Sequence, residues 1–184
     1  AAEQVAGASL RTLSALVNKA LLWMDSDGRC SIHELLRQYA AEQLETLGSD
    51  ASARAAHSAY YLEALAGRES DLTGHNQLVT LNDIEADIEN IRAAVTFAAS
   101  QRDYTRLAAA VQPLWLYFYY GGAYADGEAF FEALARVLRS DAPTSPRDAL
   151  LGDVLTHQAH LLLRRSEVAR ADQCLSEAEP LIEA

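Results

Sequence analysis

The sequence is poor in lysine, proline and cysteine, and each shortage excludes a class of structure or chemistry. Lys19 is the only lysine among 184 residues, and no G-x-x-x-x-G-K-[ST] phosphate-binding loop surrounds it. The two cysteines, Cys30 and Cys174, lie far apart, which indicates reduced thiols rather than a disulfide framework. With only four prolines, long stretches of the chain are free to form helices.

Positive charge is also scarce. The chain has 15 Lys+Arg against 26 Asp+Glu, a formal net charge of −11, which argues against a nucleic-acid or anionic-membrane binder because both need a basic face. The longest apolar run, residues 114–120, is far shorter than the roughly 20 residues that span a bilayer. No signal peptide is visible at the N-terminus. We therefore expect a cytoplasmic protein that contacts neither nucleic acid nor membrane directly.

Alanine and leucine are abundant instead, with 35 and 27 copies. They are the strongest helix formers, so the sequence predicts an all-α protein. The chain begins and ends within helical patterns, at Ala1 and Ala184, and we expect it to be a segment of a longer protein. Gly48 ends a predicted helix at about Leu47, and only helical periods follow from Ser49, so we expect two domains, residues 1–47 and 48–184.

The first predicted domain combines helices with a small β-hairpin. A helix over residues 8–18 precedes two short strands, 20–24 and 29–32, joined by a turn in which Gly28 supplies a positive φ. Ser31 and Glu34 fit an S-x-x-E capping box at the start of a helix that Gly48 ends. This order of elements is typical of the end of a winged-helix unit.

Only helical periods follow, in helices predicted at 50–66, 84–95, 104–120, 122–139, 147–164 and 167–183, with residues 68–80 irregular. Pro113 is expected to bend or interrupt its helix. The break at 122–128 recurs at 166–172, an interval of 166 − 122 = 44 residues. Ala159, Ala171 and Ala178 are spaced 12 and 7 residues apart, as small residues are in tetratricopeptide repeats. We expect a right-handed superhelix of antiparallel, tetratricopeptide-like helix pairs; two ordinary αα-hairpins are the alternative.

Four segments carry a resemblance to a known family. Residues 32–40, I-H-E-L-L-R-Q-Y-A, resemble the M-H-E/D-L-L-R-Q-Y-A segment that closes the winged-helix domain of STAND-class signalling ATPases. These NB-ARC-like nucleotide switches occur in bacterial transcriptional regulators of LuxR-type and antibiotic-regulator architecture. Residues 13–22, 57–61 and 87–94 are similar to the family's L-x-x-L-V-x-K-S-L-L, H-A-x-Y-Y and E-x-D-N-L-R-A-A segments. Ala20 and Ile32 depart from the family pattern, as do Asp87 and Glu89.

His33 is the principal candidate site residue. It lies where a strand enters a helix, so its imidazole can face the positive end of that helix, or it can be a structural histidine. The resemblance implies that His33 contacts the β-phosphate of ADP in the full-length protein. It also implies a nucleotide-binding domain elsewhere in the same polypeptide, with ATP or ADP bound there and no cofactor in this segment. The helical repeats would receive a protein partner or a small-molecule inducer.

An aromatic run supplies the candidate partner-binding residues. At helical spacing Trp115, Phe118 and Tyr119 share one face, which is typical of a core stripe. Tyr117 and Tyr120 point elsewhere, and with Tyr124 they are the interface candidates.

No pattern indicates catalysis or metal binding. His157 and His160 are three residues apart, and Cys30 pairs with His33, but neither pair has the further ligands that a metal needs. Residues 1–46 carry a net charge of 4 − 6 = −2, which disfavours DNA contact by the winged-helix unit. The sequence thus favours a non-catalytic regulatory segment of a STAND-type ATPase. The alternatives are a free-standing helical-repeat adaptor for protein–protein interaction and, third, an enzyme using His57 or the His157/His160 pair.

Overall fold

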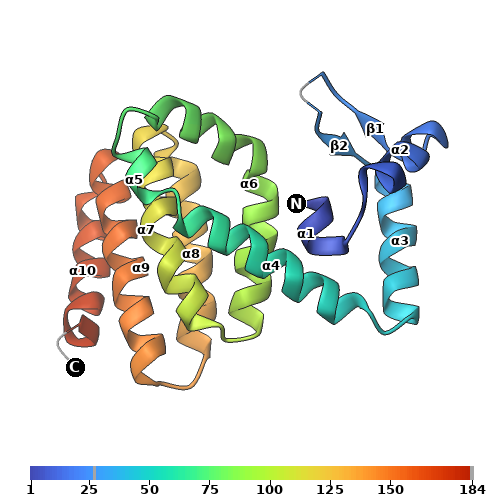
Figure 1. Ribbon diagram of the computed structural model, residues 1–184. Helices are drawn as coiled ribbons and strands as arrows, with labels where there is room; N and C mark the ends of the chain where they lie inside the picture. Colours follow the sequence, from blue (N-terminus) through green and yellow to red (C-terminus); the bar gives the residue numbers. More distant parts are fainter. Residues whose placement is uncertain (27, 183–184) are drawn as a thin grey trace. The chain divides into compact units, whose positions relative to one another are not determined.

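The computed structural model describes residues 1–26 and 28–182, which form ten helices and one two-stranded hairpin (Figure 1). The predicted all-α class is therefore confirmed. The chain divides into two compact units, Ala1–Tyr60 (unit 1) and Tyr61–Ala184 (unit 2). The predicted domain boundary between residues 47 and 48 stays a prediction. Each unit is described by itself.

Unit 1 contains α1 (Ala2–Ala6), α2 (Leu10–Asn18), the strands β1 (Trp23–Met24) and β2 (Cys30–Ser31), α3 (Glu34–Thr46) and the first part of α4 (Asp50–Ala66). The strands are antiparallel, with Trp23 opposite Ser31. Gly28 has φ 79° in the connecting turn, and Gly48 has φ 65° after α3. The predicted order of helix, hairpin and helix is confirmed, with shorter strands. Whether these elements belong to a winged-helix domain stays a prediction.

The predicted capping box is wrong. Ser31 belongs to strand β2 and lies too early in the chain to cap α3, which begins at Glu34. His33 is the N-cap residue instead, and its Nδ1 accepts a hydrogen bond of 3.2 Å from the Leu35 N–H. The Glu34 carboxylate does not fold back on the backbone but accepts hydrogen bonds from Arg37 and Gln38.

Unit 1 has almost no buried side chains. Among residues 1–26 and 28–60, only Ser58 is buried. Large apolar side chains remain exposed throughout, namely Leu10, Leu21, Trp23, Met24, Ile32, Leu35, Tyr39, Leu44 and Leu47. Because burial of apolar surface is the main stabilising term in folding, this unit gains little stability from its own contacts.

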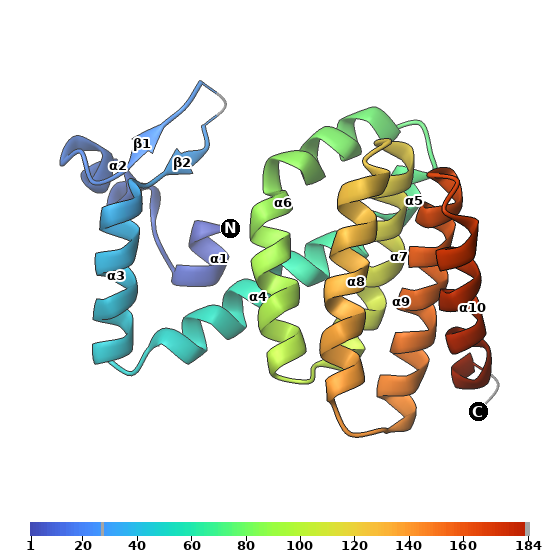
Figure 2. The same ribbon diagram turned by 180° about the vertical axis from the view of Figure 1, so that it is seen from behind.

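Unit 2 holds the core of the protein. Its helices are the end of α4, α5 (Glu69–Leu72), α6 (Gln77–Ser100), α7 (Tyr104–Tyr120), α8 (Tyr124–Ser140), α9 (Ser145–Arg164) and α10 (Val168–Ile182). Neighbouring helices from α6 to α10 run in alternating directions (Figure 2). The predicted irregular segment 68–80 is wrong in part, since it holds α5 and the start of α6. Helix α7 is continuous through the buried Pro113, so of the predicted bend or interruption the interruption is wrong and the bend stays a prediction.

Three turns of unit 2 share one geometry. Arg102, Gly122 and Ser166 each follow a helix with φ of 57°, 72° and 62°. The next backbone N–H donates back across the last helical turn to the carbonyl five residues earlier, at 3.0 Å, 3.1 Å and 3.0 Å. This closure is the Schellman motif. The predicted 44-residue recurrence is thus visible as the same turn at Gly122 and Ser166, whereas the superhelical arrangement stays a prediction.

Small residues allow the helices of unit 2 to approach closely. Ala159, Ala171 and Ala178 are all buried, and Ala159 and Ala171 pack with Leu162 between α9 and α10. A Cβ at Gly127 would lie 2.7 Å from Phe118 and 2.8 Å from Leu161. The predicted close packing at these spacings is therefore confirmed. No helix in the described part of the chain is both long and apolar enough to cross a membrane.

Candidate functional site

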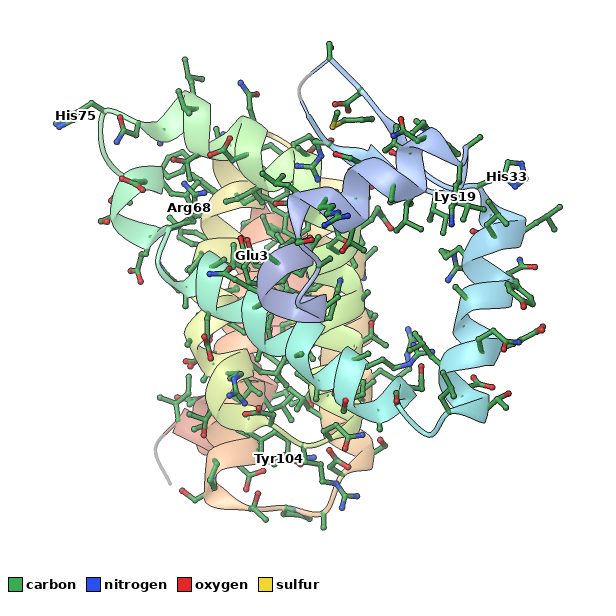
Figure 3. All side chains as sticks on the ribbon, turned by 45° about the vertical axis from the view of Figure 1, so that its right-hand side comes forward. Glu3, Lys19, His33, Arg68, His75 and Tyr104 are labelled. Carbon is green, nitrogen blue, oxygen red and sulfur yellow. The ribbon has the colours of Figure 1, made fainter. Side chains whose placement is uncertain are left out.

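His33 occupies the N-terminal end of α3. Its ring projects away from the helix (Figure 3), and the side chain is exposed. Because Nδ1 accepts the Leu35 N–H, a neutral His33 ring carries its proton on Nε2. That N–H is directed outward and can donate to an anion. The orientation of the ring is fixed by the helix cap and requires no other side chain.

The charged groups next to His33 are already paired with one another. Arg37 donates through Nε and Nη2 to the Glu34 carboxylate, at 2.7 Å and 2.6 Å. Gln38 donates to the same carboxylate at 2.8 Å. The hydrogen bonds from Arg37 and Gln38 lower the pKa of Glu34 to about 2, so this carboxylate stays charged at neutral pH. Arg37 therefore neutralises Glu34 beside the exposed imidazole.

The second candidate site joins aromatic and histidine side chains from α7, α8 and α9. We name it the aromatic–histidine cluster, and it consists of Trp115, Tyr119, Tyr124, His157, His160 and Arg164. The Trp115 ring stacks on His157 with centroids 5.1 Å apart and lies 5.6 Å from His160. The Arg164 guanidinium lies 5.5 Å and 5.4 Å from the Tyr119 and Tyr124 ring centroids, as in a cation–π contact.

Two nitrogen atoms within this cluster lack hydrogen-bond partners. Trp115 Nε1 and His157 Nδ1 are buried and have no partner among the described residues. Burial, together with repulsion from His160, lowers the pKa of His157 to about 4. His157 is therefore neutral at physiological pH. The rings facing it are those of Trp115, Phe131 and His160, and no carboxylate contributes to its pKa shift.

The tyrosines selected from the sequence have three different environments. Tyr117 is buried, and its hydroxyl donates to Glu85, so the prediction that it is free for a partner is wrong. Burial and the Glu85 hydrogen bond raise its pKa. Tyr120 is 46% exposed, and Tyr124 is half-buried with its hydroxyl near Arg164.

The predicted core stripe of α7 is also wrong in part. Phe118 is buried as expected, but Trp115 and Tyr119 are only half-buried and belong to the surface cluster. The physical reason is that α7 packs against α5, α6, α8 and α9, so most of its circumference is buried. A buried helix has no simple division into one inner and one outer face.

Sequence reasoning missed a groove between α6 and α8. It encloses about 430 Å³ and is named the α6–α8 groove; its lining residues are Arg92, Val95, Thr96, Ala99, Ala129, Phe130, Ala133, Leu134 and Val137. The available signal was a stripe of small exposed residues, Ala129 and Ala133, on the otherwise amphipathic α8. The stripe on α8 indicates a groove only once α6 is known to lie beside it, because α6 supplies the other wall.

Sequence reasoning also missed a charged cluster that joins α8 to α9 and α10. Glu128 is buried and accepts hydrogen bonds from Arg165 at 3.2 Å and Arg170 at 2.5 Å. Gln158 lies 3.4 Å from the same carboxylate. A buried carboxylate is costly without hydrogen-bonding partners, and the two arginines supply them. Glu128 is paired with both arginines across three helices, which indicates a structural role.

Among the described residues, no group of three or more His, Cys, Asp or Glu side chains is arranged to hold a metal ion. Comparison with protein-family models, with curated proteins and with solved structures gave no match to this chain.

Proposed function

We propose that this chain is the regulatory segment of a STAND-type signalling ATPase, and more narrowly of a transcriptional regulator. In this proposal the chain itself is non-catalytic. Unit 1 transmits the nucleotide state of another domain of the same polypeptide, and the helices of unit 2 receive a protein partner or small-molecule inducer. The four sequence segments that resemble this family support the proposal.

The observation that carries the proposal is the lack of buried side chains in unit 1. Nine large apolar side chains between Leu10 and Leu47 remain exposed. Large apolar side chains exposed in this number, with almost none buried, favour packing against another protein surface. A nucleotide-binding domain in the same polypeptide would cover these side chains, and movement of that domain would change how much of unit 1 is covered.

His33 would detect the nucleotide in this arrangement. Its Nε2–H is directed outward from the α3 N-terminus, where a helix favours negative charge. A β-phosphate placed there would accept this hydrogen bond. The bond would hold unit 1 against the ADP-bound domain in the resting state, and its loss would release unit 1.

The test uses the full-length protein with its nucleotide-binding domain. Loss of one hydrogen bond to a charged group costs about 1.5–3 kcal/mol, so His33→Ala should accelerate ADP release roughly tenfold to a hundredfold. Release is measured by stopped-flow displacement of a fluorescent ADP analogue. His75→Ala, at an exposed histidine of unit 2, is the matched control and should leave the rate unchanged. An unchanged rate in His33→Ala would contradict the role of His33.

A free-standing helical-repeat adaptor is the second candidate, and the aromatic–histidine cluster favours it. Half-buried Trp and Tyr side chains are enriched at the centres of protein interfaces. The two functions differ in what covers unit 1. A regulator predicts strong hydrogen-exchange protection of residues 1–60 only when a nucleotide-binding domain is attached, whereas an adaptor predicts the same protection without it. A protein whose preceding residues lack a G-x-x-x-x-G-K-[ST] motif would exclude the regulator.

A further inference from the structure

The α6–α8 groove has the dimensions and composition of a small-molecule site. Its volume of about 430 Å³ lies within the roughly 300–1,000 Å³ range of ligand pockets. The lining spans Ala129 to Val137 on α8, which at 1.5 Å per residue is about 12 Å of helix. Helices α6 and α8 lie side by side along it (Figure 2).

The lining is apolar except at one end. Val95, Ala99, Phe130 and Leu134 are buried, while Ala129 and Ala133 leave room above them. Apart from the Thr96 hydroxyl, the polar lining group is the Arg92 guanidinium. An apolar groove with a single cationic end matches a ligand that has an apolar body and one anionic group.

Arg92 is held in place by its packing. Its guanidinium carbon lies 5.9 Å from the Phe118 ring centroid and 5.4 Å from that of Phe130. Its polar partner among the described residues is Glu89, whose Oε1 lies 3.4 Å from Arg92 Nε. Glu89 is 86% exposed, so this pair is weak, and the fork of Arg92 retains N–H groups for a bidentate carboxylate.

The direction of the helices favours the anion at the Arg92 end. Helices α6 and α8 run in the same direction, and Arg92 contacts Phe130 near the N-terminal end of the α8 lining. The other end of the groove reaches Ala99, next to the last residue of α6, where the helix carries partial negative charge. The net charge of −11 has little influence here, because charges beyond about 8 Å are screened at physiological ionic strength.

We propose that the α6–α8 groove binds a small amphiphilic carboxylate, with its apolar body between the two helices and its carboxylate on Arg92. A protein partner fits less well. The groove has nine lining residues, whereas a stable protein interface uses about 20–30 residues on each side. The site lies entirely in unit 2 and rests on the proposed function in so far as it names the class of small-molecule inducer. Its test uses no nucleotide, so its failure is distinguishable from failure of the nucleotide switch.

Isothermal titration calorimetry of the full 184-residue chain with decanoate, below its micelle-forming concentration, tests the proposal. We expect saturable binding of one decanoate per chain, and at least about tenfold weaker binding of decan-1-ol, which lacks the charge. Arg92→Met keeps the packing on Phe118 and Phe130 and should weaken decanoate about tenfold while leaving decan-1-ol unchanged. Arg136→Met, at an exposed arginine of α8 outside the lining, is the matched control and should bind as the wild type does.

Ala133→Trp provides a second variant at an exposed position of α8, where folding is not at risk. The indole should fill the groove and abolish binding of both compounds, with the thermal unfolding midpoint confirming that the variant is folded. Equal affinity for decanoate and decan-1-ol, or wild-type affinity in Ala133→Trp, would overturn the proposal. So would sedimentation and NMR evidence that a second copy of the chain fills the groove in the absence of decanoate.

Discussion

His157 makes the stability of unit 2 depend on pH. Its ring stacks on Trp115 and lies near Phe131, and its pKa is lowered to about 4 by burial and by His160, from an ordinary value of 6.5. Between these values the unfolded chain binds a proton at His157 that the folded chain does not bind. The contribution of the neutral His157 to stability is therefore fully present above pH 6.5. The free energy of unfolding falls as the pH falls from 6.5 to about 4.

The size of the effect follows from the shift. A difference of 2.5 pKa units at 1.36 kcal/mol per unit is about 3 kcal/mol. His157→Phe replaces the imidazole by an apolar ring of similar size and should remove this contribution. At neutral pH the variant should be as stable as the wild type or up to about 1 kcal/mol more stable, because it also removes the unpartnered Nδ1. Its advantage over the wild type should grow by about 3 kcal/mol from pH 7 to pH 4.

Urea unfolding followed by tryptophan fluorescence is the assay. The chain has two tryptophans, so a Trp23→Phe background makes Trp115 the reporter of unit 2. Carboxylates titrate in the same window, but they do so equally in both proteins, and the difference between wild type and variant isolates His157. His75→Gln, at an exposed histidine, should reproduce the wild-type pH dependence. Parallel stability curves for the wild type and His157→Phe would refute the assignment of the buried, neutral histidine.

Two further predictions concern backbone and packing. Gly127→Ala should lower the free energy of unfolding by about 1–3 kcal/mol, because its Cβ would lie 2.7 Å from Phe118. Gly67→Ala meets nothing closer than 3.7 Å and should not be destabilising; equal losses in the two variants would contradict the packing argument. Ser166→Gly should raise the free energy of unfolding by about 1 kcal/mol, because Ser166 has φ 62°. Thermal and urea denaturation measure both effects, and a less stable Ser166→Gly variant would exclude strain at this turn.

Local signals in the sequence were sufficient for most helices. Gly48 and the Gly121–Gly122 pair identified helix ends correctly, because a residue with positive φ is readily recognised when it is glycine. The breaks at Arg102 and Ser166 also fall between predicted helices, but their positive φ was not predicted because neither residue is glycine. The capping box is absent because Ser31 pairs with Trp23 across the hairpin and so belongs to a strand rather than to the start of α3.

Of the candidate sites, some were predictable from local sequence and others only from the packing of distant helices. Sequence alone placed His33 at the start of α3, since a strand and a helix meet there. It did not decide the environment of Tyr117, because a helix surrounded by α5, α6, α8 and α9 buries residues on several faces. The aromatic–histidine cluster unites residues up to 164 − 115 = 49 positions apart, and no local pattern specifies that separation.

The amino-acid sequence by itself determined the helical class, most helix boundaries and the small residues at helix contacts, because propensities, turns and periodicity act over a few residues. The tertiary structure decided which side chains are buried and which meet. Three local arrangements each depend on helices that are far apart in the chain. They are the stacking of neutral His157 on Trp115, the pairing of Glu128 with its arginines, and the position of Arg92 at the end of an apolar groove. Burial and proximity are properties of the packed molecule, and they decide which of these groups are paired, which lie in a groove and, for His157, which protonation state is favoured.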